Sequence, residues 1–434
     1  MADTLAGFPF WKLQFNEKGD PPTGGDSFLA GVPAAKLTDL FVFSHGWNND
    51  PTTAMALYTG FFGEVRKIVD DASVPKRRQA VIGVTGIVWP SILFPDDAGS
   101  ANTGGAASFD PTAGTAALAS ELPKVFVKPE QQQPLQDLIR MLADQASDND
   151  TLFRFRDTLA RLVSPPTTVS STQDNMELLG LSANDDQWLR ILDSLGMPQG
   201  DDGSQGGAAD FGGFFGRAWN GAKNALRGAT YYEMKNRAGV IGKNALGPLL
   251  SKLHVAAPNL KVHLLGHSFG ARLVSYALTA LASGDTPVKS LFLLQGAFSH
   301  FAFADALPFD SSRKGDLAGM AARVDGPLLT TFTSKDLAVG NAYPIASIIA
   351  GQDASDASDL MYRWEGMGHD GAQAVNAAGA PLGGVKTAYA FQKGQWLNLD
   401  GNQIIIHGGP PSGAHGDIVH PETAWAAIAA AGIA

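Results

Sequence analysis

The sequence predicts an α/β protein with a mostly parallel sheet, helices on both faces and a large lid-like insertion. Short apolar runs alternate with segments of helical periodicity near both ends of the chain. The block between them lacks this alternation and is rich in Gly, Ala, Ser and Asp around its helical segments. We therefore expect one core domain built from residues 1–95 and 226–434, with residues 96–225 as a partly flexible lid or cap.

Three strands and a helix are expected before the insertion. Residues 9–16 alternate between apolar and polar side chains, as an edge strand does. Residues 37–44 contain the continuous apolar run that is typical of a buried parallel strand. A helix follows at 52–70, and residues 79–89 form the third expected strand.

The insertion is expected to contain helical segments near 131–162 and 174–195 and a mobile loop at 200–207. Residues 211–234 carry several aromatic side chains among small residues. This pattern suits either a lid helix with an apolar face or, as the pattern favours, a helix that packs into a core.

The alternation of strands and helices resumes after the insertion and extends to the end of the chain. Strands are expected at 260–265, 288–294, 328–333 and 403–407, and helices at 237–253, 271–282 and 421–431.

Composition excludes several classes of function. The net charge of −10 and the absence of any long Lys/Arg run argue against a nucleic-acid partner. The chain has no cysteine, so disulfides, thiolate catalysis and Cys-ligated zinc are excluded. No apolar run reaches transmembrane length, and no signal peptide is visible, so a cytoplasmic location is the default expectation.

The run Gly266-His267-Ser268-Phe269-Gly270 has the spacing G-x-S-x-G. An apolar strand leads directly into it and a helical pattern follows, which predicts a sharp strand-to-helix turn that exposes the central side chain. The two glycines are needed because a side chain there would clash with the neighbouring strand and helix. Ser268 is therefore the predicted nucleophile.

A serine nucleophile needs a base and an acid that orients the base. Asp336 follows the strand at 328–333, so it is expected at the same edge of the sheet as Ser268 and is the predicted acid. Asp305 and Asp310 follow the preceding strand and remain alternatives.

The predicted base is His415, which lies in a loop of small residues before the last helix. His420 is the main alternative, although it leads directly into that helix, and His407 and His369 are weaker ones. The resulting order along the chain is Ser, acid, His.

An oxyanion hole is the third requirement, because negative charge develops on the carbonyl oxygen during attack. The backbone N–H of Phe269 is one predicted donor. The second is the N–H of Trp47, in the loop His45-Gly46-Trp47 that follows the strand at 37–44, where Gly46 lets the backbone turn towards the site.

Together, the His-Gly-Trp loop, the G-x-S-x-G turn, Asp336 and His415 resemble the α/β-hydrolase superfamily. The resemblance covers roughly residues 36–95 and 230–434, and its single-glycine oxyanion loop is similar to that of one group of lipases and esterases. It implies hydrolysis of esters, amides or thioesters through an acyl-enzyme, without a cofactor.

Ester hydrolysis is the favoured function, with a small-molecule, lipid-like or polymeric ester as substrate, because an aromatic-rich insertion over the site suits a bulky or apolar acyl group. A serine peptidase or amidase on the same fold is the first alternative, and a non-catalytic binding protein is the second. No metal is expected, because neither His369-Asp370 nor His415-Gly416-Asp417 has the spacing of a known ligand motif.

Overall fold

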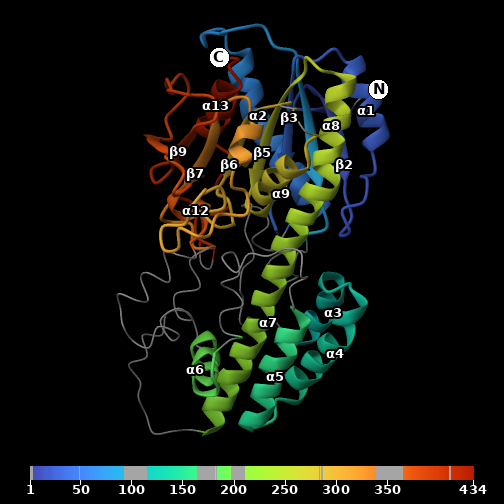
Figure 1. Cartoon of the computed structure of the whole chain (residues 1–434), viewed down its shortest axis with the longest axis vertical. Coiled ribbons are helices and arrows are strands. Elements are labelled where there is room, and N and C mark those ends of the chain that lie inside the picture. The colour runs from blue at the N-terminus through green and yellow to red at the C-terminus, as the bar shows by residue number, and fades with distance from the viewer. Residues whose placement is uncertain are drawn as a thin grey trace.

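The computed structural model describes residues 3–47, 49–91, 115–163, 181, 183–196, 211–282, 284, 287–338, 365–409 and 412–434. Within these residues the chain is an α/β protein, as the sequence predicts (Figure 1). None of the helices in these ranges combines the length and the apolarity that crossing a membrane requires. The helices are α1 (Gly25–Ala34), α2 (Pro51–Asp70), α3 (Thr115–Val125), α4 (Pro129–Asp144), α5 (Asn149–Leu162), α6 (Asp185–Leu195), α7 (Phe211–Ile241), α8 (Gly247–Ala256), α9 (Phe269–Ala277), α12 (Met367–Asp370) and α13 (Pro421–Ala430).

The described strands form a single sheet in the order β1-β2-β4-β3-β5-β6-β7-β9-β8. All neighbouring pairs are parallel except β1 with β2. The carboxyl ends of the parallel strands therefore meet at one edge, where loops can bring side chains from distant parts of the chain together. The strands are β1 (Asp3–Leu5), β2 (Phe8–Gln14), β3 (Asp39–Ser44), β4 (Ile82–Val88), β5 (Lys261–His267), β6 (Val288–Leu294), β7 (Leu328–Phe332), β8 (Ala378–Pro381) and β9 (Trp396–Asp400).

Both faces of the sheet are buried, and β3 shows how its apolar run serves them. Leu40 and Val42 point into the core shared with α1, α8 and α9. Phe41 and Phe43 point into the core shared with α2 and α13. A strand buried on both faces needs apolar residues at every position, which explains the continuous run in the sequence.

A second group of helices, α3 to α6, packs beside α7 at some distance from the sheet (Figure 1). The 31-residue helix α7 extends from this group to the sheet and continues through a π-helical turn at Gly242–Leu246 into α8. Trp219 and Leu226 of α7 are fully buried, so this helix packs into a core. The predicted boundary between residues 225 and 226 falls inside α7.

Two expectations for strands were wrong. The strand at 9–16 is not an edge strand, because β1 pairs along its outer side. Residues 403–407 form no strand, since the backbone N–H groups of Ile404 and Ile405 both donate to the carbonyl of Gly401 in a tight turn after β9. The buried side chain of Ile405 accounts for the apolar signal. The mobile loop expected at 200–207 lies outside the described residues.

Candidate active site

Ser268 lies at the sharp turn between β5 and α9, at the carboxyl edge of the sheet. Its φ of 57° and ψ of −124° place a non-glycine residue in a strained region of backbone space. The hydrogen bond from Ser268 N to Leu294 O ties this turn to the end of β6. This is the geometry that the sequence predicts for a nucleophile turn.

The glycines of the G-x-S-x-G run stand at close backbone contacts. A Cβ on Gly270 would lie 2.1 Å from the carbonyl oxygen of Ser44, at the end of β3. A Cβ on Gly266 would lie 2.4 Å from the carbonyl oxygen of Gly270. Any side chain at either position would push α9 away from the sheet and move Ser268 with it.

Asp336 and His415 form a buried acid–base pair. Their side chains are fully buried, and His415 Nδ1 lies 2.7 Å from Asp336 Oδ2 although the residues are 79 positions apart in the chain. Backbone hydrogen bonds from Leu337 N to Ser412 O and from Ala414 N to Lys335 O hold the two loops together. With Nδ1 facing a carboxylate, His415 presents Nε2 as the atom that can accept a proton.

The base loop is also tied to the nucleophile turn, through His267. The Nε2 of His267 donates to the backbone carbonyl of His415 at 2.9 Å, because a carbonyl can only accept. Burial, followed by the electrostatic effect of the neighbouring His415 imidazole, lowers the pKa of His267 to about 3, so the His267 ring stays neutral. His267 therefore holds the loop that carries His415, the predicted base.

No hydrogen bond joins Ser268 to His415 in this structure, because Nε2 of His415 is buried without a hydrogen-bond partner. Catalytic hydrogen bonds are often long in unliganded proteins and tighten when substrate binds. Ser268 itself is buried, with 4% of its surface exposed.

Gln295 is a site residue that the sequence reasoning missed. It directly follows β6, is fully buried and has a φ of 47°. Its Nε2 donates to Asp336 Oδ2, the oxygen that also contacts His415, and to the carbonyl of Gly368, each at 3.0 Å. A polar residue directly after an apolar strand, one strand away from the nucleophile turn, is the signal that could have found it.

The predicted oxyanion loop lies against the nucleophile turn. A Cβ on Gly46 would lie 2.5 Å from Ser268 Cβ and 3.0 Å from its Oγ. The ring of Trp47 stacks on that of Phe269 with centroids 6.0 Å apart. As the first residue of α9, Phe269 has an N–H without an intrahelical acceptor. Both predicted donors therefore belong to segments that touch Ser268 or directly follow it.

His45 supports this loop from behind. The backbone N–H of Trp89 donates to Nε2 of His45 at 3.3 Å. Nδ1 of His45 therefore carries the ring proton, which it donates to Gly46 O at 2.8 Å. The backbone N–H of His45 donates to the hydroxyl of Tyr58. Burial lowers the pKa of His45 to about 4, so the ring is neutral and serves as a structural clamp.

The helix α7 reaches the same place with one aromatic side chain. Tyr231 contacts Phe269 with ring centroids 4.5 Å apart and Trp47 with centroids 5.4 Å apart. The long helix that carries the α3–α6 group therefore packs directly on both residues whose N–H groups are the predicted oxyanion donors.

The alternative acids and bases lie elsewhere. Asp305 is exposed, and Asp310 caps its own turn through Ser312. His407 and His420 both contact Asp417, His420 at the start of α13. His369 contacts Glu365 rather than Ser268. Of the candidates that the sequence offers, the structure brings Asp336 and His415 together.

A second Ser-His-Asp arrangement lies at the opposite edge of the sheet. His263 Nε2 is 3.0 Å from Asp39 Oδ1, and His263 Nδ1 is 2.8 Å from Ser290 Oγ. Arg78 makes two hydrogen bonds to Asp39. All three members lie on strands, so Ser290 lacks the strained turn that presents Ser268. This arrangement is structural, and it provides an internal control for experiments on Ser268.

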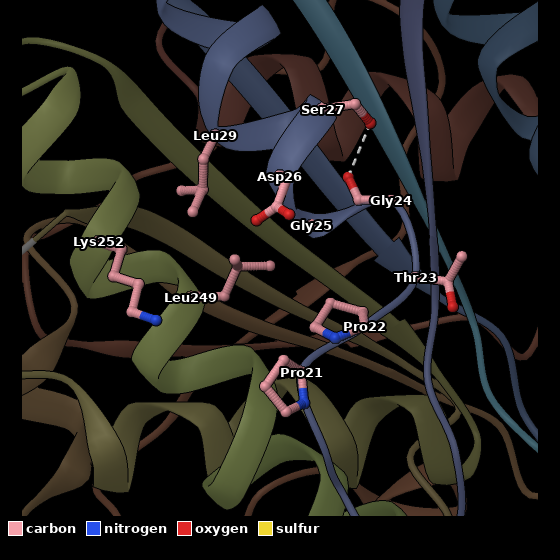
Figure 2. A pocket seen from close by; sticks show the side chains of 10 residues that line it. All are labelled: Pro21, Pro22, Thr23, Gly24, Gly25, Asp26, Ser27, Leu29, Leu249 and Lys252. Atoms are coloured by element: carbon pink, nitrogen blue, oxygen red, sulfur yellow. Dashed lines mark hydrogen bonds between the residues drawn. The ribbon is translucent and has the colours of Figure 1, made fainter.

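A cavity of about 430 Å³ lies between α1 and α8 (Figure 2). Apolar residues and one residue of each charge, Asp26 and Lys252, line it. None of the predicted site residues is among the lining residues, so this cavity is separate from the candidate active site.

No protein-family model, no curated protein and no solved structure matches the chain.

Proposed function

We propose that this protein is a serine hydrolase of the α/β-hydrolase fold that cleaves carboxylic esters through an acyl-enzyme. The observation that carries the proposal is the combination of a strained Ser268 turn and a buried Asp336–His415 pair at the same edge of the sheet. A buried Asp–His pair also occurs without a strained serine turn, as the Asp39–His263–Ser290 arrangement shows. Their combination is what nucleophilic catalysis requires.

In the proposed reaction, Ser268 Oγ attacks the ester carbonyl carbon while its proton passes to His415 Nε2. Asp336 accepts the Nδ1 hydrogen bond and stabilises the imidazolium that forms. The N–H groups of Phe269 and Trp47 stabilise the negative oxygen of the tetrahedral intermediate. The proton on Nε2 then moves to the departing alkoxide, and water, activated by the same nitrogen, releases the acid.

The proposed substrate is an ester with a bulky or apolar acyl group. Trp47, Phe269 and Tyr231 gather three aromatic rings beside the nucleophile. Sites that bind apolar groups are lined in this way. We also propose that residues 96–225 form the cap over this site, since α7 connects their helices to Phe269.

The test is covalent labelling with a fluorophosphonate probe, combined with hydrolysis of a p-nitrophenyl ester series of increasing chain length. Wild type and Ser290→Ala should be labelled and active, whereas Ser268→Ala should be neither. Because Ser290 is a buried serine hydrogen-bonded to a histidine, its variant controls for general effects of removing such a hydroxyl.

Labelling that survives in Ser268→Ala would refute the assignment of the nucleophile. Labelling of Ser268 without hydrolysis of any ester, but with cleavage of matched anilides, would replace the esterase by the amidase alternative. Neither labelling nor hydrolysis in folded wild type would favour a non-catalytic binding protein.

A further inference from the structure

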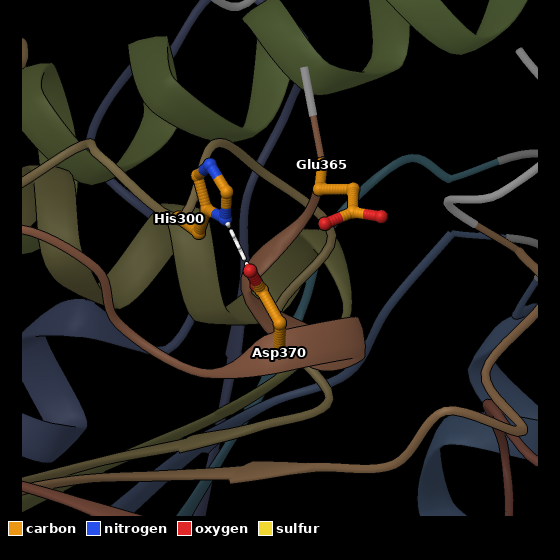
Figure 3. A group of neighbouring side chains, drawn as sticks. All are labelled: His300, Glu365 and Asp370. Carbon is orange, nitrogen blue, oxygen red and sulfur yellow. Dashed lines mark hydrogen bonds and ion pairs between the residues drawn. The ribbon is translucent and has the colours of Figure 1, made fainter. Parts of the chain in front are cut away.

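A second group of chemically reactive side chains includes one residue of the loop that follows β6. The potential ligand atoms of His300, Glu365 and Asp370 all lie within 4.8 Å of one another (Figure 3). His300 Nδ1 is 2.9 and 2.8 Å from the two oxygens of Asp370. His300 is fully buried, and the two carboxylates are partly buried.

The charges of this group are not balanced by its described neighbours. Within the described residues, no Lys or Arg forms an ion pair with either carboxylate, and the imidazole of His369 lies with Nε2 3.7 Å from Oε1 of Glu365. Two neighbouring carboxylates removed from water are costly to keep ionised unless a cation joins them.

The ligand types distinguish between cations. Calcium and magnesium prefer all-oxygen sites, whereas zinc accepts a mixture of imidazole and carboxylate. Metal–ligand bonds of about 2.0–2.1 Å at tetrahedral angles separate the ligand atoms by about 3.3 Å. The contact between His300 and Asp370 is slightly shorter than this, and Glu365, within 4.8 Å of both, needs to approach by at most about 1.5 Å. Water would supply the fourth ligand.

We propose that His300, Glu365 and Asp370 form a zinc-binding site that links the loop after β6 to residues 365–370. Zinc would bind Nδ1 of the neutral imidazole, so the proton that His300 shares with Asp370 would move to Nε2 of the same ring. The evidence for zinc binding does not rest on the proposed hydrolase activity.

Backbone hydrogen bonds already join the two segments that the zinc ion would link. His300 N donates to Glu365 O, Met367 N to Phe298 O, and Gly368 N to Gly296 O. These bonds form a short antiparallel ladder whose opposite end is the Gln295–Gly368 contact. Zinc at His300 would therefore stabilise one end of the ladder whose other end positions Asp336.

The experiment measures zinc binding to chelator-treated full-length protein by titration calorimetry, with cobalt absorption as a second reading of coordination. Wild type should bind one zinc ion at this site, gain thermal stability with zinc, and show the intense visible bands of four-coordinate cobalt. Glu365→Gln should weaken this binding at least about tenfold, since loss of even an outer-shell partner costs that much. It removes no protein hydrogen bond, so the fold should be kept.

Two control variants separate this site from other sources of zinc binding. Glu130→Gln removes an exposed carboxylate from α4 and should bind zinc as wild type does. Asp417→Asn disrupts the contacts with His407 and His420, where two imidazoles meet one carboxylate. Zinc affinity that falls in Asp417→Asn but not in Glu365→Gln would overturn the proposal, as would binding of calcium in preference to zinc.

Discussion

Replacing Asp336 by Asn tests whether Gln295 helps to set the tautomer of His415. Three groups donate to the carboxylate: His415 Nδ1 and Gln295 Nε2 to Oδ2, and Ala338 N to Oδ1. A carboxamide has one oxygen and one NH₂ group. Placing the NH₂ at the Oδ2 position opposes two donors, whereas placing it at the Oδ1 position opposes one. The second orientation costs less and keeps an acceptor facing His415.

The two orientations of the amide predict different losses of kcat. If the acceptor stays in place, the variant loses the charge that strengthens the hydrogen bond to the imidazolium, which is worth about 1.5–3 kcal/mol. At 1.36 kcal/mol per tenfold change in rate, kcat should fall by about 10- to 150-fold. If the amide turned round, His415 would adopt the wrong tautomer, and a loss of about 10⁴-fold is typical of that.

The assay is kcat for p-nitrophenyl ester hydrolysis by Asp336→Asn, alone and combined with Gln295→Leu. The single variant should lose about 10- to 150-fold, and the double variant should approach 10⁴-fold because the amide can then turn. A single variant that already loses 10⁴-fold would refute the role given to Gln295. A loss of less than tenfold would refute Asp336 as the acid.

Two further predictions concern the oxyanion loop and the structural Ser-His-Asp arrangement. Gly46→Ala should lower kcat/KM by about 10²-fold with an unchanged circular dichroism spectrum. The new Cβ would lie 2.5 Å from Ser268 Cβ, and misplacing a reacting group by about 1 Å costs about 10²-fold in rate. Full activity would show that the loop is not close to Ser268 in solution. Burial raises the pKa of Asp39, but hydrogen bonds from Arg78 and His263 outweigh it and hold the pKa well below its usual range. Its contribution to stability is therefore present above the ordinary value of about 3.9 and is lost as pH falls towards the lowered value. Asp39→Asn should cost about 3–5 kcal/mol at pH 7 and flatten the decline of stability below about pH 5 in denaturant titrations, and an unchanged decline would contradict this role.

The parts of the site that the sequence predicts share one physical cause. Ser268 and Asp336 follow buried strands, and the parallel sheet gathers strand ends at one edge irrespective of distance along the chain. His415 was found by chain order and by its small neighbours, and its contact with Asp336 agrees with that reasoning.

The roles of the remaining residues depend on contacts between distant parts of the chain, which a local sequence pattern does not specify. Gln295 acts through a side-chain hydrogen bond to another loop, and His300 meets Glu365 across 65 positions of sequence. The apolar run at 403–407 indicates a strand, but Ile405, one of its three isoleucines, is buried in a turn. Burial and β-branching alone do not distinguish these two settings.

The continuity of α7 has a consequence for how the molecule melts. Its buried residues belong to one apolar core that extends from the sheet to Phe155 and Trp188 in the α3–α6 group. A segment whose core is shared with its host has no separate melting transition, so calorimetry should record a single endotherm. Excising α3–α6 would also expose Trp219, on which Phe155 packs, and would leave an aggregation-prone apolar surface.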